Sequence, residues 1–164
     1  RYLPAVSVMV ILAFTFCTKL ALPNWKNSEA AFRHAINVTK NNHIAEVGIG
    51  NVWLGRGDLT KARSHYLESL RIKPDHTAAM TNLGIVYMKQ GLFEDAIAQL
   101  GKALEANPTD VKILNSIGVA LACTGRYEEA IDRFREALRR SPNYQEARDN
   151  LTKILMGMKG SFMH

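Results

Sequence analysis

Histidine and cysteine are the residue types in this sequence best suited to catalysis or metal binding, but neither stands in a pattern that predicts such chemistry. His34, His43, His65 and His76 fall on the surfaces of predicted helices or between them, without a carboxylate at a recurring distance. No phosphate-binding glycine loop, nucleophile elbow or metal-binding His/Glu motif occurs. The sequence therefore predicts solvated histidines, no catalytic residue, no metal site and no cofactor.

The cysteines and the charges exclude further classes of protein. Cys17 and Cys123 form no CxxC or Cys/His pattern, so neither a disulfide framework nor a zinc site is predicted. The net charge is +6, from 21 Lys and Arg against 15 Asp and Glu. Basic and acidic residues alternate along the chain, whereas a nucleic-acid site needs a clustered basic stripe. We expect no nucleic-acid partner.

Several residue types recur along the chain with one period of 34 residues. Two columns of glycine, one of alanine and one of proline share it: Gly50, Gly84 and Gly118; Gly57, Gly91 and Gly125; Ala62, Ala96 and Ala130; Pro74, Pro108 and Pro142. Four independent columns with the same period predict a structural unit that is used three times.

Each unit is predicted to be a pair of antiparallel helices. A glycine in the middle of a helix, such as Gly118, costs about 1 kcal/mol against alanine, so its recurrence predicts a neighbouring helix backbone too close for a side chain. The second glycine is predicted to end the first helix. Asp75, Asp110 and Asn143 follow the prolines and are predicted to cap the next first helix. A single pair cannot bury its apolar stripe, so the units must stack.

These columns resemble the tetratricopeptide repeat (TPR), which pairs an apolar residue with glycine and then places tyrosine, alanine, phenylalanine, alanine and proline at the same spacing. The resemblance implies an all-α, right-handed helical solenoid of antiparallel pairs, with full repeats at 43–76, 77–110 and 111–144. Trp53 replaces the tyrosine and Ser69 the last alanine in the first repeat. We expect these departures to alter local packing and not the fold.

Partial units flank the three repeats. Residues 23–42 match a second helix alone, with Phe32 in the phenylalanine column. Residues 145–158 are predicted to form an amphipathic capping helix, although Thr152 stands where the repeat has glycine. Residues 159–164 are predicted to form a tail.

The stretch from Leu3 to Leu22 contains twenty residues with Lys19 as its only charge. At about 1.5 Å per residue, a helix of this length reaches about 30 Å, the thickness of a bilayer's hydrocarbon core. We therefore predict a transmembrane helix over residues 1–22 and a membrane location with a single span. A cleaved signal peptide and a buried core helix are the alternatives; no small-residue cleavage site follows cleanly, and the stretch is apolar on all sides.

The junction from Trp25 to Ala35 reads WKNSEAAFRHA. It resembles the segment that joins the last membrane helix to the TPR tail of polytopic membrane proteins similar to GT-C glycosyltransferases, including transmembrane-and-TPR O-mannosyltransferases. The resemblance implies that the chain is the tail of a larger membrane protein, with its repeats on the periplasmic or lumenal side. Catalytic residues would then lie outside this chain.

In the TPR family the first helices line a concave groove, and its outward positions follow the spacing i, i+3, i+7, i+10. We predict that these positions bind a partner: Val47, Asn51, Leu54, Thr81, Ile85, Met88, Lys112, Asn115 and Val119. Their mixture of apolar and amide groups suits a peptide or a partner helix, with Asn51 and Asn115 bonding to its backbone. Alternatively, several of the aliphatic residues pack between neighbouring first helices.

The function predicted from these features is that of a membrane-anchored scaffold that binds a peptide or a partner protein and is not itself an enzyme. One alternative is the acceptor-binding part of a GT-C-like glycosyltransferase. Another is a stand-alone, single-span assembly factor. Val47 and Ser116 stand where TPR domains that capture carboxy-terminal chaperone peptides need basic residues, so that ligand is not expected.

Overall fold

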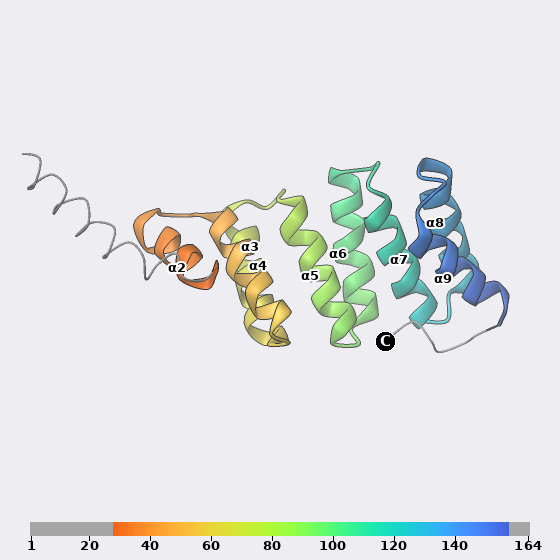
Figure 1. The fold of residues 1–164 in the computed structure, drawn as a ribbon, viewed down its shortest axis with the longest axis horizontal. Coiled ribbons are helices and arrows are strands. Elements are labelled where there is room, and N and C mark those ends of the chain that lie inside the picture. The colour runs from red at the N-terminus through yellow and green to blue at the C-terminus, as the bar shows by residue number, and fades with distance from the viewer. Residues whose placement is uncertain (1–27, 158–164) are drawn as a thin grey trace, which may run out of the picture.

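The computed structural model describes residues 28–157, and within this range every regular element is a helix. The helices are α2 (Ser28–Val38), α3 (His43–Gly55), α4 (Leu59–Ile72), α5 (Thr77–Lys89), α6 (Phe93–Ala106), α7 (Val111–Cys123), α8 (Tyr127–Arg140) and α9 (Gln145–Leu155). They stand in a row from α2 at one end to α9 at the other (Figure 1). The predicted all-α helical solenoid is confirmed.

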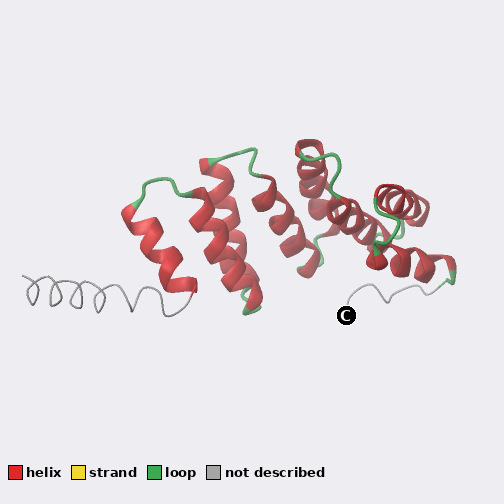
Figure 2. Ribbon diagram, turned by 45° about the horizontal axis from the view of Figure 1, so that its top comes forward, coloured by secondary structure: helices red, strands yellow, loops and turns green. Residues whose placement is uncertain are grey.

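Helices that are consecutive in the chain pack side by side. The pairs α3–α4, α5–α6 and α7–α8 form the three repeats, and each second helix also packs against the next first helix. At the two ends α2 packs on α3 and α8 packs on α9 (Figure 2). The first helices α3, α5, α7 and α9 also contact one another in turn. Residues on these four helices therefore form one continuous face.

The glycine in the middle of each first helix makes room for a large side chain. A Cβ atom built on Gly118 would lie 2.6 Å from the ring of Phe134, which comes from the second helix of the same repeat. The prediction of a closely passing backbone is therefore wrong: the close neighbour is a side chain. The same relation joins Gly50 to Tyr66 and Gly84 to Leu100, and Gly48 makes room in the same way for Phe32 of the preceding helix α2.

A left-handed glycine ends each first helix, as predicted. Gly125 has a φ of 82°, a conformation that most side chains disfavour. Its amide donates to the carbonyl of Ala122 at 3.1 Å, and the amide of Arg126 donates to the carbonyl of Leu121 at 3.0 Å. This pair of bonds satisfies carbonyl groups at the end of α7 and turns the chain into the second helix.

Capping at the start of the first helices differs from the prediction. Asp110 caps α7, because its Oδ1 accepts from the amides of Lys112 at 2.8 Å and Ile113 at 3.3 Å. Asp75 and Asn143 do not cap, since the capping positions of α5 and α9 are the residues that follow them, His76 and Tyr144. Asp110 lies two residues after its proline, whereas Asp75 and Asn143 lie only one residue after theirs.

This difference makes a matched pair of variants informative. We expect Asp110→Ala to lower the free energy of unfolding by about 1 kcal/mol, because two amides of α7 lose their acceptor. Asp75→Ala removes the same side chain from a position that caps nothing and should change stability by less than about 0.5 kcal/mol. Urea denaturation of both variants measures the difference. Equal losses would contradict the assigned cap.

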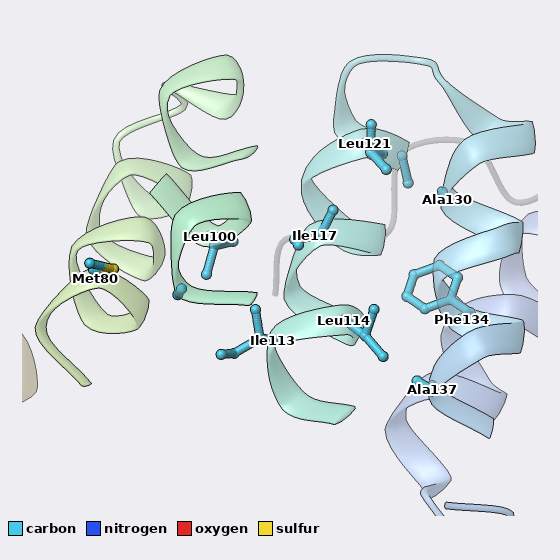
Figure 3. Close-up of a cluster of buried hydrophobic side chains, with 12 residues drawn as sticks. Met80, Leu100, Ile113, Leu114, Ile117, Leu121, Ala130, Phe134 and Ala137 are labelled. Atoms are coloured by element: carbon cyan, nitrogen blue, oxygen red, sulfur yellow. The ribbon is translucent and has the colours of Figure 1, made fainter. Parts of the chain in front are cut away.

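The buried side chains form two clusters along the solenoid. The larger one runs from α5 to α9 and surrounds Phe134, which is fully buried and lies between Ala130 and Ala137 on α8, beside Leu114 of α7 (Figure 3). The smaller one joins α3, α4 and α5 and is centred on Tyr66. The smaller cluster contains fewer buried residues, and the first repeat also buries two polar side chains, Glu46 and Ser69.

The prediction of a membrane location requires correction. Among the described residues, no helix has both the length and the apolar character needed to cross a membrane. A single-span membrane fragment, with its repeats on a periplasmic or lumenal side, is therefore not supported. The stretch Leu3 to Leu22, on which that prediction was based, lies outside the described residues, as do residues 159–164 of the predicted tail.

Candidate functional site

The nine residues predicted to bind a partner lie on α3, α5 and α7, but they are not equally accessible. Val47 is 8% exposed and belongs to the smaller core cluster, so it packs between helices, as the alternative interpretation held for some positions. Thr81 is half-buried, and its hydroxyl donates to the carbonyl of Thr77 in its own helix at 2.9 Å. Val47 is therefore not presented to a partner, and the hydroxyl proton of Thr81 is already used within α5.

Asn115 supports the packing of the capping helix. Its side chain is 8% exposed, and its Oδ1 accepts from the Nδ2 of Asn150 in α9 at 3.0 Å. Tyr144 lies beside the same amide, and burial together with the nearby Glu146 carboxylate raises the pKa of the Tyr144 hydroxyl. Asn115 thus joins α7 to α9 and is placed poorly for the predicted bond to a partner's backbone.

Asn51 is exposed and is held in one orientation from two sides. Its Oδ1 accepts from the Tyr66 hydroxyl at 2.7 Å and from the Nδ2 of Asn82 at 2.8 Å. Burial raises the pKa of Tyr66 to about 12, so the hydroxyl keeps its proton and remains a donor at ordinary pH. Within the described part of the chain nothing accepts from the Nδ2 of Asn51. That N–H group is available to a ligand.

The sequence did not identify Asn82 as part of this site. Asn82 lies 31 residues after Asn51, outside the series i, i+3, i+7, i+10 that selected the nine positions. Its side chain crosses from α5 to α3. An asparagine next to the outward position Thr81 is the one signal in the sequence that pointed to it.

The accessible part of the predicted site is smaller and mostly apolar. We name it the open face and define it by six residues: Asn51, Leu54, Ile85, Met88, Lys112 and Val119. Asn51 and Lys112 are exposed and the other four are half-buried. Met88 and Val119 rest on the larger core cluster and Leu54 on the smaller one. Lys112 carries the single charge among the six.

His43, His65 and His76 contact other side chains, whereas the sequence predicted solvated histidines. His65 contacts a carboxylate after all, because its Nδ1 lies 2.8 Å from Glu46 Oε2 across the α3–α4 interface. His43 and His76 face each other at a ring-centroid distance of 4.8 Å. The pairing of His65 was not predictable from local spacing, since Glu46 lies 19 residues away and stands where the other repeats have Met80 and Leu114.

Two hollows lie away from the open face, between α6 and α8. One has a volume of about 850 Å³ and the other about 410 Å³, and they share Leu104, Pro108 and Arg133 among their lining residues. Arg139 and Arg140 pair with one carboxylate, that of Glu136, so the rim of the larger hollow keeps a net positive charge. None of the nine residues predicted to bind a partner lines either hollow, and we keep the candidate site on the first helices. Among the described residues, no group of three or more His, Cys, Asp or Glu side chains is arranged to hold a metal ion.

Solved structures with the same fold are similar to this chain at low sequence identity. The crystal structure of MamA aligns with a TM-score of 0.73 and 16% identity, over 79% of this chain and 76% of that one. The first TPR of Spaghetti (RPAP3), bound to the HSP90 peptide SRMEEVD, aligns with a TM-score of 0.69 and 24% identity, over 75% and 98%. The Arabidopsis OM64 TPR domain gives 0.68 and 22%, over 70% and 95%.

Comparison with sequence families gives the membership directly. No curated protein matches the sequence significantly, and no comparison shows the predicted link to the tails of GT-C-like or O-mannosyltransferase proteins, which stays a prediction. Two models described as tetratricopeptide repeat match residues 41–109 and 81–148. Together they cover residues 41–148, more than half of the chain, and the chain therefore belongs to the tetratricopeptide repeat family.

Proposed function

We propose that the chain is a non-catalytic scaffold that binds a segment of another polypeptide on the open face. The observation that carries this proposal is the fixed amide of Asn51, whose oxygen is occupied by Tyr66 and Asn82 while its N–H group is left for a partner. A backbone carbonyl of a bound peptide is the natural acceptor for such a donor.

The apolar residues of the open face define what the partner presents. Ile85 and Met88 are three residues apart on α5 and therefore share one side of that helix. Leu54 and Val119 flank them on α3 and α7, the two first helices that contact α5. Half-buried aliphatic groups at neighbouring positions suit one or two apolar anchor side chains from the partner.

The charge of the open face argues for a partner segment with few acidic residues. The domain similar in fold that was solved with SRMEEVD accommodates a peptide with acidic residues near its carboxyl end. Here Lys112 is the single cation of the open face, and the buried Val47 offers no second one. The proposal is therefore an apolar peptide segment held by one amide and one lysine.

A negative charge introduced on the open face tests this proposal. Peptides selected from a random library against the full chain should bind Ile85→Glu at least tenfold more weakly, a loss of about 1.4 kcal/mol, because the new carboxylate must be desolvated beside an apolar anchor. Ile85 belongs to neither core cluster, so we expect the variant to fold. Isothermal titration calorimetry measures the affinities.

The matched control places the same substitution on a second helix. Leu67 on α4 is 43% exposed and lies outside the open face. We expect Leu67→Glu to bind the selected peptides like the unmodified chain. Binding that is weakened by Leu67→Glu and unaffected by Ile85→Glu would show that the open face is not the binding site.

A further inference from the structure

The interior of the first repeat contains a polar group where the other repeats are apolar. Ser69 is fully buried and occupies the column that holds Ala103 and Ala137 in the second and third repeats. Its Oγ donates to the carbonyl oxygen of His43 at 2.9 Å and lies 3.0 Å from Nδ1 of His76. One hydroxyl thus connects three helices, since His43 begins α3, Ser69 lies in α4, and His76 precedes α5.

The His43 ring that faces His76 favours an uncharged His76. A serine hydroxyl has one hydrogen, and here it points to the carbonyl of His43, so Nδ1–H of His76 donates to the Ser69 oxygen. The other ring nitrogen of neutral His76 then carries no proton. The rings of His43 and His76 meet edge to face, with centroids 4.8 Å apart and planes at 84°. Two imidazolium ions at that distance would repel each other.

The surroundings of His76 also oppose its protonation, through burial and through nearby positive groups. Burial lowers the pKa of His76 below the ordinary value of 6.5, and the His43 ring on α3 and Lys73 at the end of α4 lower it further, while Asp75 in the loop raises it. His76 is also the N-cap residue of α5, and His43 is the first residue of α3. The amino-terminal end of a helix disfavours positive charge.

We propose that the joint between the first two repeats, made by His43, Ser69 and His76, is an acid-sensitive hinge. It is closed while His76 is neutral, and it opens when His76 is protonated. A histidine whose pKa is lowered by folding stabilises the folded joint above its unfolded pKa, and this contribution is lost as the pH falls below about 6.5. The second and third repeats, with alanine in place of Ser69, lack this contact.

Opening of the hinge would also change the open face. The hydrogen bond from Asn82 to Asn51, at 2.8 Å, crosses the same boundary between α3 and α5. Separation of the two helices releases Asn51 from one of its two donors. This consequence for partner binding rests on the function proposed above, whereas the hinge itself does not.

The carboxylates respond to acid in a different pH range. Ion pairs with arginine or lysine hold the pKa of Glu29, Asp58, Glu68 and Glu129 below their ordinary values of 4.5 or 3.8. Stability that comes from these groups is present above those values and is lost only as the pH falls below them. Acidification from about pH 7.5 to about pH 5.5 therefore tests the histidines.

The hinge can be tested on the free chain, without a partner, in the presence of a metal chelator. NMR titration of the histidine ring protons should show that His76 titrates below the ordinary histidine value. Along the same titration, backbone amide signals of α3 and α5 beside the joint should move, while those of α7 and α8 should not. The thermal midpoint should fall between about pH 7.5 and about pH 5.5.

Substitutions show whether the joint causes that fall. His76→Gln cannot take up the proton, so most of the fall in midpoint should disappear, whereas His34→Gln, on the exposed surface of α2, should keep it. His43→Gln provides a second test, because removing the facing ring should raise the pH at which His76 titrates. A fall in midpoint that is equally large in His76→Gln, or titration of His76 at or above its ordinary value, would overturn the proposal.

Discussion

We expect Phe134→Ala to lower the free energy of unfolding by about 3–5 kcal/mol, as removal of a fully buried aromatic side chain does. Phe134 has no exposed surface and fills the space above Gly118 in the larger core cluster. Helix α8, which carries Phe134, cannot move to fill that space without losing its contacts with α7 and α9. Chemical denaturation followed by circular dichroism measures the loss.

Two comparisons make this prediction specific to the site. Phe93→Ala removes the same side chain from a half-buried position at the start of α6 and should cost clearly less. Hydrogen exchange should accelerate most in α7, α8 and α9, because each unit of a solenoid contacts only its neighbours. A uniform acceleration that includes α3 and α4 to the same degree would contradict this local account.

The substitution Gly118→Ala should destabilise the protein by up to about 2 kcal/mol, although alanine is the better helix former. Alanine contributes about 1 kcal/mol through helix propensity, but its Cβ would lie 2.6 Å from the ring of Phe134. Overpacking of a buried site costs about 1–3 kcal/mol, which outweighs the gain. The same denaturation experiment measures the sum.

A double mutant and a matched glycine separate the gain in helix propensity from the cost of overpacking. In the background of Phe134→Ala the ring is absent, so adding Gly118→Ala should be neutral or stabilising, with a coupling of about 1–3 kcal/mol. Gly101→Ala, in the middle of α6, has no atom within 4 Å of the added Cβ and should stabilise by about 0.5–1 kcal/mol. If Gly101→Ala destabilised the protein and Gly118→Ala did not, the assigned contact between residue 118 and Phe134 would be contradicted.

The repeat architecture was predictable from the sequence because each column reflects a backbone or packing requirement. Gly57, Gly91 and Gly125 were recognised as helix ends, since only a left-handed turn needs glycine at that point. The recurring columns do not show which atom each of these residues contacts. Gly118 stands in a recurring column, but its contact with Phe134 depends on the angle between two helices, which spacing along the chain does not give.

The candidate site was predictable only in outline. Helical spacing selected both Asn51 and Asn115, but they stand in different columns of the repeat, and one is exposed while the other is buried against α9. Asn115 is held there by Asn150, which lies 35 residues further along the chain in α9. The contact between Glu46 and His65 escaped prediction for the same reason. The bonds from Asn82 to Asn51 and from Asn150 to Asn115 start from one column of the repeat but end in two different columns, so the period alone did not predict them.

The measurement that tests the central claim most directly is a chemical-shift map of the bound state. The isotopically labelled chain is titrated with one peptide chosen from the library selection, and shifts of its backbone amides and of the Asn51 side-chain amide are followed by NMR. Our account predicts that the largest shifts occur on α3, α5 and α7 and include the Asn51 side chain. Shifts confined to α4, α6 and α8, around the hollows lined by Leu104 and Arg133, would contradict it.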